Sequence, residues 1–418
     1  MIQPLILKAY SPEYIIKKPE KIVLYSTKSF KLSLKFLIIC NRTSLAGSLL
    51  FGQPIYANNF WSKVKLESVK VLRGSVKEFR VETYDLNVME GGFYKKIPKD
   101  IRYGFTHDVL LLNIENTRYR EEIVVEVNLD VNASRVDSSK LSFVDISGNI
   151  RDAKRELGDD YDIYTAHTFY WDYLSPPVQR ILKHLKEFLV HKYQKPIEDI
   201  PIYLITREIL NWLAYNMYYM DRFDYPTFRL KASQILNRTI EIEGKSKYYG
   251  VCRHIVDVFI TLARGLGVPS NRYEGMLFDD FEGKLTFLGF HAWAEVYVPR
   301  VGWLPIEVTI THPYERDLVN IGDLEYAYYV PLVHEYNNYE LPFVSPFVVT
   351  ILSAQVYNAS SNGVNKELSK EENDIFSLIV YIPTLGYISL KDLTLIVLIS
   401  LLFIDNLYIH RKLSRKST

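Results

Sequence analysis

Residues 248–254 read Tyr-Tyr-Gly-Val-Cys-Arg-His, residues 290–299 read Phe-His-Ala-Trp-Ala-Glu-Val-Tyr-Val-Pro, and residues 302–309 read Gly-Trp-Leu-Pro-Ile-Glu-Val-Thr. These stretches contain a cysteine, a histidine and a carboxylate, three side chains that can take part in chemistry. Each of the three falls on a different predicted element.

A helix is predicted directly after the first stretch. Apolar residues recur at three- and four-residue steps from Ile255 to Leu266, which makes one buried stripe. Gly267 and Pro269 are typical of the end of such a helix. Cys252 therefore lies at the helix N-terminus, where unpaired backbone N–H groups and the helix dipole favour an anion. This position favours the reactive thiolate form of a cysteine.

The second and third stretches are predicted to form a β-hairpin, because their residues alternate between two faces. If the connecting loop holds an odd number of residues, His291 and Glu307 become direct or diagonal cross-strand neighbours. The carboxylate can then orient the imidazole, and the imidazole can take the proton of a nearby thiol. We therefore assign Cys252 as the candidate nucleophile, His291 as general base and acid, and Glu307 as the orienting carboxylate.

These residues resemble the transglutaminase-like superfamily of papain-like cysteine enzymes. The resemblance rests on Gly250-x-Cys252, on Ala-Arg-Gly-Leu-Gly-Val-Pro at 263–269, on His-Ala-Trp-x-Glu at 291–295 and on Gly-Trp-x-Pro-x-Glu-x-Thr at 302–309. It implies an α+β catalytic domain over residues 201–345 that attacks an amide or peptide carbonyl through a thioester, resolved by water or by an amine. The family usually has Asp where this chain has Glu307, which carries the same charge on one more methylene.

Two other interpretations of these residues stay open. A binding or scaffold protein would keep the fold without turnover, although it has no evident need for both Cys252 and His291. Cys252 and His254 could also be metal ligands, but no second Cys/His pair has the spacing of a zinc site. No metal, nucleotide or flavin motif occurs, so no cofactor is expected.

Composition limits the class of protein. The chain has 418 residues, which is enough for two or three domains, and its formal net charge is +1. No basic cluster interleaved with aromatic residues occurs, so nucleic acid is not an expected partner. The only cysteines are Cys40 and Cys252, which excludes a disulfide framework. Cys40 follows an apolar run and is interpreted as a buried strand residue.

The region before the motif is predicted to be mostly β-structure. Short alternating or apolar runs separated by turn residues, from about residue 21 to 144, predict an antiparallel β-sandwich-type domain over residues 1–150. Residues 151–200 are predicted as a linker and a leading helix, because the segment from Asp145 to Asp162 is polar and glycine-containing. Tyrosine-rich segments at 215–225 and 326–339 are predicted either to line a substrate cleft or to pack in the core.

The C-terminal region is predicted as a spacer over 346–387, a transmembrane helix over 388–409 and a basic tail over 410–418. Leu393 to Ile404 is apolar apart from Thr394 and Ser400. As a helix it would rise only about 18 Å, so neighbouring residues must complete a span of about 30 Å. A buried C-terminal helix is the alternative to a membrane span.

The orientation in the membrane is predicted from charge. The basic tail puts the C-terminus in the cytoplasm and the catalytic domain outside, although residues 1–24 contain no apolar signal segment. The full prediction is a papain-like transglutaminase core preceded by the β-domain and followed by a single membrane anchor. Its expected partners are a protein or peptide substrate and the membrane.

Overall fold

The structure is a computed structural model. It describes residues 23–40, 48–57, 59, 61–90, 93–97, 106–116, 118–137, 141–142, 144–220, 229–281, 284–309, 327–337, 347–358, 379–382 and 386–389.

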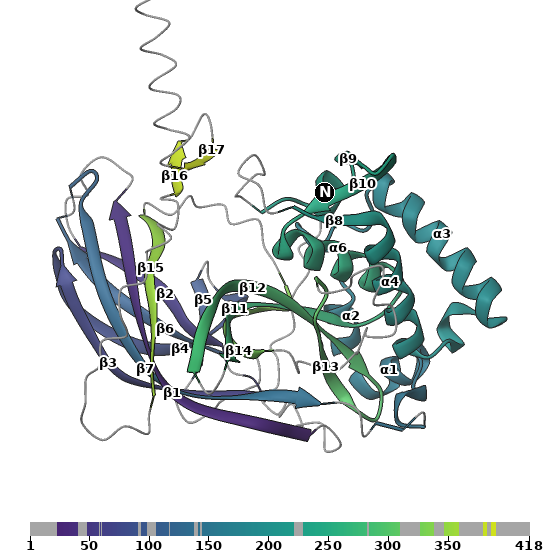
Figure 1. Ribbon diagram of the computed structural model, residues 1–418, viewed down its shortest axis with the longest axis horizontal. Coiled ribbons are helices and arrows are strands. Elements are labelled where there is room, and N and C mark those ends of the chain that lie inside the picture. The colour runs from purple at the N-terminus through teal and green to yellow at the C-terminus, as the bar shows by residue number, and fades with distance from the viewer. Residues whose placement is uncertain are drawn as a thin grey trace, which may run out of the picture.

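Two antiparallel four-stranded sheets lie at one end of the molecule (Figure 1). The first has the strand order β15-β1-β7-β3 and the second has the order β2-β6-β4-β5. Their strands are β1 (Val23–Cys40), β2 (Ser48–Ala57), β3 (Ser62–Arg73), β4 (Val76–Glu90), β5 (Phe93–Ile97), β6 (His107–Glu115), β7 (Glu122–Asp137) and β15 (Phe347–Asn358). The antiparallel β-structure predicted for this part of the chain is confirmed.

Alternation along the strands explains why these sheets pack together. The even-numbered residues of β1 from Phe30 to Ile38 and the odd-numbered residues of β7 from Ile123 to Val131 are at most 2% exposed. The register sets Phe36 opposite Val125, so both sets face the same side. Leu112 of the second sheet belongs to the same core. The two sheets therefore bury their inner faces against each other, as in a β-sandwich.

The structure corrects the predicted spacer over 346–387. Phe347–Asn358 forms β15, which pairs antiparallel with β1 from Phe30 opposite Asn358 to Cys40 opposite Phe347. The polar composition that suggested a spacer begins only at Asn358, where β15 ends. The chain thus returns after β14 to complete the N-terminal sheet.

The predicted transmembrane helix over 388–409 lies mostly outside the described residues. Its first two residues are wrongly placed, because Ile388 and Ser389 belong to β17 (Gly386–Ser389), which pairs with β16 (Ile379–Ile382). Among the described residues, no helix is both long and apolar enough to cross a membrane. Residues 390–418, which include the basic tail, are not among those described.

Helices pack at the other end of the molecule (Figure 1). They are α1 (Ile150–Leu157), α2 (Asp160–Tyr164), α3 (Pro176–Tyr193), α4 (Ile202–Asn216), α5 (Ala232–Ile235) and α6 (Cys252–Gly265), with 3-10 turns η1 (Asp145–Ser147) and η2 (Ile197–Asp199). The leading helix expected after Pro177 is α3. It buries Ile181, Leu182, Leu185 and Leu189 along one face, while Phe188, which was expected on that face, is exposed.

The polar segment predicted as a linker from Asp145 to Asp162 is instead ordered as η1, α1 and α2. Asn149 accepts the Asp152 N–H at 3.0 Å and so caps the start of α1. The helix buries Ile150, Ala153 and Leu157 and turns its charged residues to solvent. The prediction was wrong because a short amphipathic helix with a polar outer face has the same composition as a linker.

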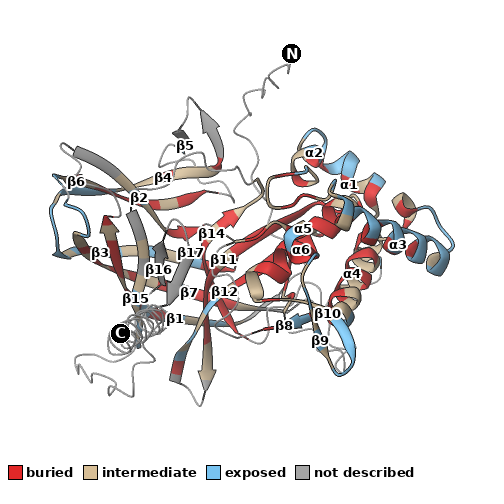
Figure 2. Cartoon of the chain, turned by 90° about the horizontal axis from the view of Figure 1, so that it is seen from above, coloured by how far each residue is buried: buried red, intermediate tan, exposed pale blue. Residues whose placement is uncertain are grey.

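A third antiparallel sheet carries the predicted hairpin. Its order is β13-β12-β11-β14, and a small sheet of order β8-β10-β9 lies before α6. The strands are β8 (Met217–Tyr219), β9 (Thr239–Ile242), β10 (Lys245–Gly250), β11 (Ser270–Phe281), β12 (Lys284–Val298), β13 (Gly302–Ile306) and β14 (Tyr328–Glu335). The helix α6 packs on β11 and β12. Figure 2 shows buried residues running along α6 and these central strands.

The central sheet belongs to two cores. Trp293 and Val296 of β12 belong to one cluster with residues of α6. Toward the sandwich, Phe278 of β11 and Val330 of β14 pack in the other cluster with residues of β1 and β7. The rings of Phe30 and Phe278 lie 5.1 Å apart. The N-terminal sheets and the sheet of β11 to β14 therefore share buried surface.

Candidate active site

Cys252 is the first residue of α6. The preceding Val251 has extended backbone, and β10 leads into it alongside β8, with Gly250 opposite Tyr219. The helix is anchored by fully buried side chains such as Val258 and Phe259. Cys252 itself is half-buried, so its thiol sits at the edge of this core. The structure thus places Cys252 at a helix N-terminus, as the sequence predicted.

His291 and Glu307 meet through the register of the hairpin. Val298 pairs with Gly302, so the loop holds three residues, an odd number. Continuing that register beyond Ile306 makes Glu307 a diagonal neighbour of His291. His291 Nε2 lies 2.8 Å from Glu307 Oε2, and the two side chains are 11% and 9% exposed. The structure therefore brings these two predicted residues into direct contact.

The thiol and the imidazole form a hydrogen-bonded pair. Burial alone would raise the pKa of Cys252, but the hydrogen bond and charge of His291 lower it below its usual value. Burial would likewise lower the pKa of His291, yet the charge of Glu307 and the bond to Cys252 raise it to about 10. Both shifts favour a thiolate beside an imidazolium. Since Nε2 is engaged by Glu307, Nδ1 is the ring nitrogen left for the sulfur.

The Glu307 carboxylate is held by two residues that the sequence did not assign to the site. Its Oε1 accepts the Thr309 N–H at 2.9 Å and the Thr309 hydroxyl at 2.7 Å. Its Oε2 accepts the Tyr329 hydroxyl at 2.8 Å. Burial would raise the pKa of Glu307, but the charge and hydrogen bond of His291 and the bonds from Thr309 keep it below its usual value.

The contact of Thr309 with Glu307 could have been predicted from the sequence, whereas that of Tyr329 could not. Thr309 closes the quoted Glu-x-Thr pattern, which was a local signal of its contact with Glu307. Tyr329 lies on β14, across β11 from the hairpin, and its segment had been interpreted only as a cleft lining or as core packing. Tyr329 is 1% exposed, so packing is the correct part of that interpretation.

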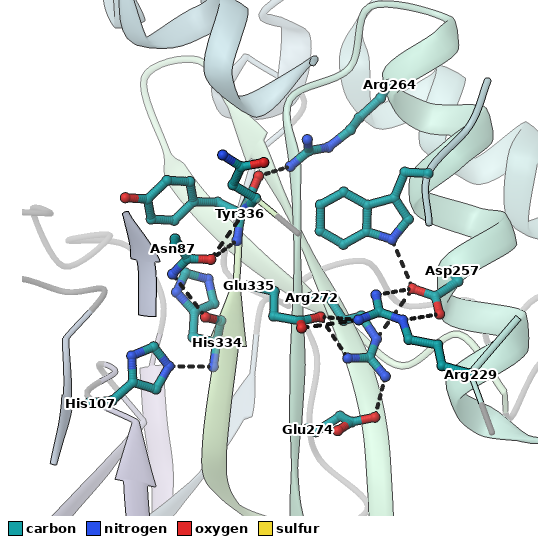
Figure 3. A network of polar contacts seen from close by, with 12 residues as sticks. Asn87, His107, Arg229, Asp257, Arg264, Arg272, Glu274, His334, Glu335 and Tyr336 are labelled. Carbon is teal, nitrogen blue, oxygen red and sulfur yellow. Dashed lines mark hydrogen bonds and ion pairs between the residues drawn. The ribbon is translucent and has the colours of Figure 1, made fainter. Parts of the chain in front are cut away.

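An ionic cluster links α6 to the central sheet (Figure 3). Arg229 donates to both oxygens of Asp257, at 2.8 and 2.7 Å, and to both oxygens of Glu335, at 3.0 and 2.8 Å. Arg272 donates to Glu335 at 2.8 Å and also contacts Glu274. Burial would raise the pKa of Asp257, but the charges of Arg229 and Arg272 hold it below its usual range.

This cluster connects the elements that carry the candidate site. Asp257 is on α6 with Cys252, Arg272 is on β11, and Glu335 is on β14 with Tyr329. Bidentate contacts between guanidinium and carboxylate fix orientation as well as distance. The cluster therefore holds the helix start and the sheet in one geometry.

A second set of polar contacts joins β14 to the N-terminal sheets (Figure 3). The His334 N–H donates to His107 Nε2 at 2.8 Å, and Asn87 Nδ2 donates to the His334 carbonyl at 3.1 Å. Asn87 Oδ1 accepts the Tyr336 N–H at 2.9 Å. Both Asn87 and His107 lie on the N-terminal sheets, so the end of β14 is attached to that domain.

The structure also shows where Cys40 and His254 lie. Cys40 is buried in β1, and both cysteines are free thiols. His254 is fully buried, and its Nδ1 accepts the Val251 N–H at 3.4 Å. Within the described ranges, no group of three His, Cys, Asp or Glu side chains is arranged to hold a metal ion.

Comparison with known families agrees with the site geometry. Residues 198–308 match the model of the transglutaminase-like superfamily. This stretch contains Cys252, His291 and Glu307 and ends just before Thr309. The chain therefore carries a transglutaminase-like domain. No curated protein matches the chain.

Solved structures with similarity to this chain include a proposed cysteine protease from Cytophaga hutchinsonii. It is 14% identical, with a TM-score of 0.47 over 81% of this chain and 93% of the other. The periplasmic domain of TgpA from Pseudomonas aeruginosa is also similar. With ethylmercury bound it is 11% identical, with a TM-score of 0.30 over 72% of this chain and 99% of its own. A second structure of that domain is 13% identical, with a TM-score of 0.28 over 65% and 95%.

Proposed function

We propose that this chain is a cysteine enzyme that attacks an amide or peptide carbonyl. Cys252 is the nucleophile, His291 is the general base and acid, and Glu307 orients the imidazole. One observation carries the proposal: a half-buried cysteine at a helix N-terminus is hydrogen-bonded to a histidine whose Nε2 lies 2.8 Å from a buried carboxylate. That is the arrangement a cysteine nucleophile requires.

The steps follow from the charges of these groups. The Cys252 thiolate bonds to the carbonyl carbon, and the developing oxyanion is stabilised by the positive end of α6. The C–N bond then breaks as the imidazolium of His291 gives its proton to the departing amine. A thioester on Cys252 and a neutral imidazole remain. Glu307 keeps the imidazole in one tautomer and orientation throughout.

The second half of the reaction releases the acyl group. The neutral imidazole of His291 takes a proton from a water or an amine as that molecule attacks the thioester carbon. The C–S bond breaks and the Cys252 thiolate returns. Water gives a peptidase or amidase and an amine gives a transamidase, so the acceptor that reaches the thioester decides between them. The proposed substrate is a protein or peptide.

The rival proposal is a binding or scaffold protein that has the fold but no turnover. A thiol-directed probe that mimics an amide separates the two, because only an activated thiolate reacts with it rapidly. We expect rapid labelling of the wild type and none of Cys252→Ala. The matched control is Cys40→Ala, which should be labelled like the wild type because Cys40 is buried. Equal labelling of Cys252→Ala would overturn the nucleophile assignment.

We further propose that residues 390–409 anchor the protein in a membrane with the catalytic domain outside the cytoplasm. The proposal is supported by the apolar run Leu393–Ile404 and by the basic residues from Arg411 to Lys416 that follow it. The protein should stay with membranes after a high-salt wash, and protease added to intact cells should digest its catalytic domain. Release by salt would contradict the anchor, and protection until lysis would contradict the orientation.

A further inference from the structure

Glu307 has a longer and more mobile side chain than the aspartate that the resemblance leads one to expect. A glutamate has one more rotatable bond, and the entropy of that bond must be overcome if the carboxylate is to stay in one place. In this structure each oxygen accepts two hydrogen bonds. Thr309 supplies both at Oε1, while His291 and Tyr329 share Oε2. The oxygen that faces the imidazole is therefore also the oxygen that Tyr329 holds.

Tyr329 approaches from a different element and is itself firmly packed. It lies on β14, where it pairs with Leu277 of β11. Its ring meets Trp293 edge-on at 5.0 Å between centroids and lies 6.4 Å from the ring of His291. These contacts fix the ring without the hydroxyl group. The hydroxyl can therefore be removed, by Tyr329→Phe, with the packing retained.

From this geometry we infer that Tyr329 is a positioning residue, which holds the Glu307 carboxylate against His291 and so keeps Cys252 in its thiolate form. The inference rests on the proposed function, because it assigns a task within that site. It also accounts for the longer side chain: Tyr329 lies where a glutamate carboxylate can reach both it and His291. An aspartate on the same backbone would be one methylene too short to contact both groups.

The direction of the effect separates this role from a purely electrostatic one. A hydroxyl that donates to a carboxylate also draws charge away from it. If that were all Tyr329 did, its removal would strengthen the pull of Glu307 on His291 and lower the pKa of Cys252. If Tyr329 positions the carboxylate, its removal lets Glu307 turn away, and the pKa of Cys252 rises.

The experiment measures the alkylation rate of Cys252 by iodoacetamide as a function of pH, with the modified residue identified by peptide mass. This readout needs no substrate. For Tyr329→Phe we expect the midpoint to move up by about half to one pH unit, which is roughly three- to tenfold less thiolate below the midpoint. An unchanged midpoint or a downward shift would overturn the inference.

The matched control is Tyr328→Phe. Tyr328 is the neighbouring buried tyrosine on β14, and its hydroxyl lies 2.7 Å from Ser26 Oγ in β1, away from Glu307. Its loss should leave the midpoint of Cys252 unchanged. A shift equal to that of Tyr329→Phe would mean that loss of any tyrosine hydroxyl on β14 disturbs the site. That result would overturn the positioning role of Tyr329.

A double-substitution comparison tests the link to the glutamate. In a Glu307→Asp background the carboxylate no longer contacts both groups, so adding Tyr329→Phe should shift the midpoint much less than it does beside Glu307. The same shift in both backgrounds would contradict the inference. If Tyr329→Phe does not fold, Thr309→Val takes its place. That variant removes a hydroxyl from Oε1 and should also raise the midpoint, and no shift would overturn the positioning of Glu307 by its neighbours.

The outcome is distinguishable from failure of the proposed function. If wild-type Cys252 titrates like an ordinary cysteine, the proposed function fails. If wild-type Cys252 titrates low and Tyr329→Phe leaves it there, only the role of Tyr329 fails.

Discussion

Two polar clusters include residues of α6, and they differ in what a proton can do to them. The first joins Cys252, His291 and Glu307, and its charges depend on where one proton resides. The second joins Arg229 and Arg272 to Asp257 and Glu335, and the pKa shifts of Arg229, Arg272 and Asp257 all favour the charged forms.

The difference indicates how the work is divided between the clusters. A cluster that stays charged at every physiological pH can fix geometry but cannot transfer protons. A thiol and an imidazole that share one proton can do chemistry, but only if their distance is fixed from outside. Breaking the first cluster should therefore cost activity, and breaking the second should cost stability.

His291→Ala should have the largest effect. Without the imidazole, Cys252 loses the hydrogen bond and charge that most lower its pKa, and nothing protonates the departing amine, so turnover should fall by about 10⁴-fold. The thermal unfolding midpoint should change by only a few degrees, because His291 lies at the edge of the core. Residual turnover within a factor of ten of the wild type would remove His291 from the mechanism.

Arg229→Met tests the second cluster. It leaves the fully buried carboxylate of Asp257 and the partly exposed carboxylate of Glu335 with one guanidinium fewer, so the free energy of unfolding should fall by about 3–5 kcal/mol. Denaturant titration measures it. Arg73→Met is the matched control, because Arg73 pairs with Glu122 at 2.7 Å on the surface and its loss should be barely measurable. Equal effects of the two substitutions would contradict the structural role of the cluster.

Glu307→Gln should have the next largest effect. It keeps the size of the side chain but removes the charge that raises the pKa of His291 to about 10. The active thiolate–imidazolium pair exists above the pKa of Cys252 and below that of His291. Removing the charge should move the alkaline limb of the pH–rate profile down, toward the ordinary histidine value. Turnover should fall by roughly a hundredfold, less than for His291→Ala. An alkaline limb that stays in place would show that Glu307 does not act on His291.

The smallest effect concerns Glu295, a buried carboxyl group on β12 with no cationic partner among the causes of its shift. Burial raises its pKa to about 8, although bonds with Tyr273 and Trp61 oppose this. Between the ordinary glutamate pKa and about 8, the folded state keeps a proton that the unfolded state has released. Its contribution to stability therefore falls as the pH rises through that window.

Comparison of the wild type with Glu295→Gln from pH 6.5 to 8 measures the contribution of Glu295, because His291, whose pKa is raised to about 10, contributes alike to both proteins. Below that range His107 opposes it, because burial lowers the His107 pKa to about 4 and makes the fold gain stability as the pH rises. Glu295→Gln carries no titrating proton, so the fall of unfolding free energy with pH should be smaller than in the wild type, by up to about 1 kcal/mol per pH unit. Parallel curves for the two proteins would mean that Glu295 is ionised in the fold.

The site was predictable from the sequence to the extent that its contacts are local. Cys252 follows from the position where a helical stripe begins, and the contact of His291 with Glu307 follows from alternation and the odd loop. Tyr329 and Arg229 were not predictable, because their partners lie 22 and 28 positions away along the chain and on other elements.

The fold shows the same limit. Alternation revealed the antiparallel strands before residue 150, but the pairing of β15 with β1 joins residues more than 300 positions apart and leaves no local signal. The linker prediction for the segment from Asp145 to Asp162 was wrong for another reason. Its buried residues are few, and only contact with the rest of the core distinguishes α1 from a charged linker.

The most direct test of the account is the thiolate absorbance of Cys252 as a function of pH, taken as the difference between the wild type and Cys252→Ala, so that Cys40 cancels. The account predicts a thiolate signal that persists well below the ordinary cysteine pKa of about 8.5, because His291 and the start of α6 stabilise the anion. A signal that appears only at or above that ordinary value would contradict an activated Cys252, and with it the proposed enzyme.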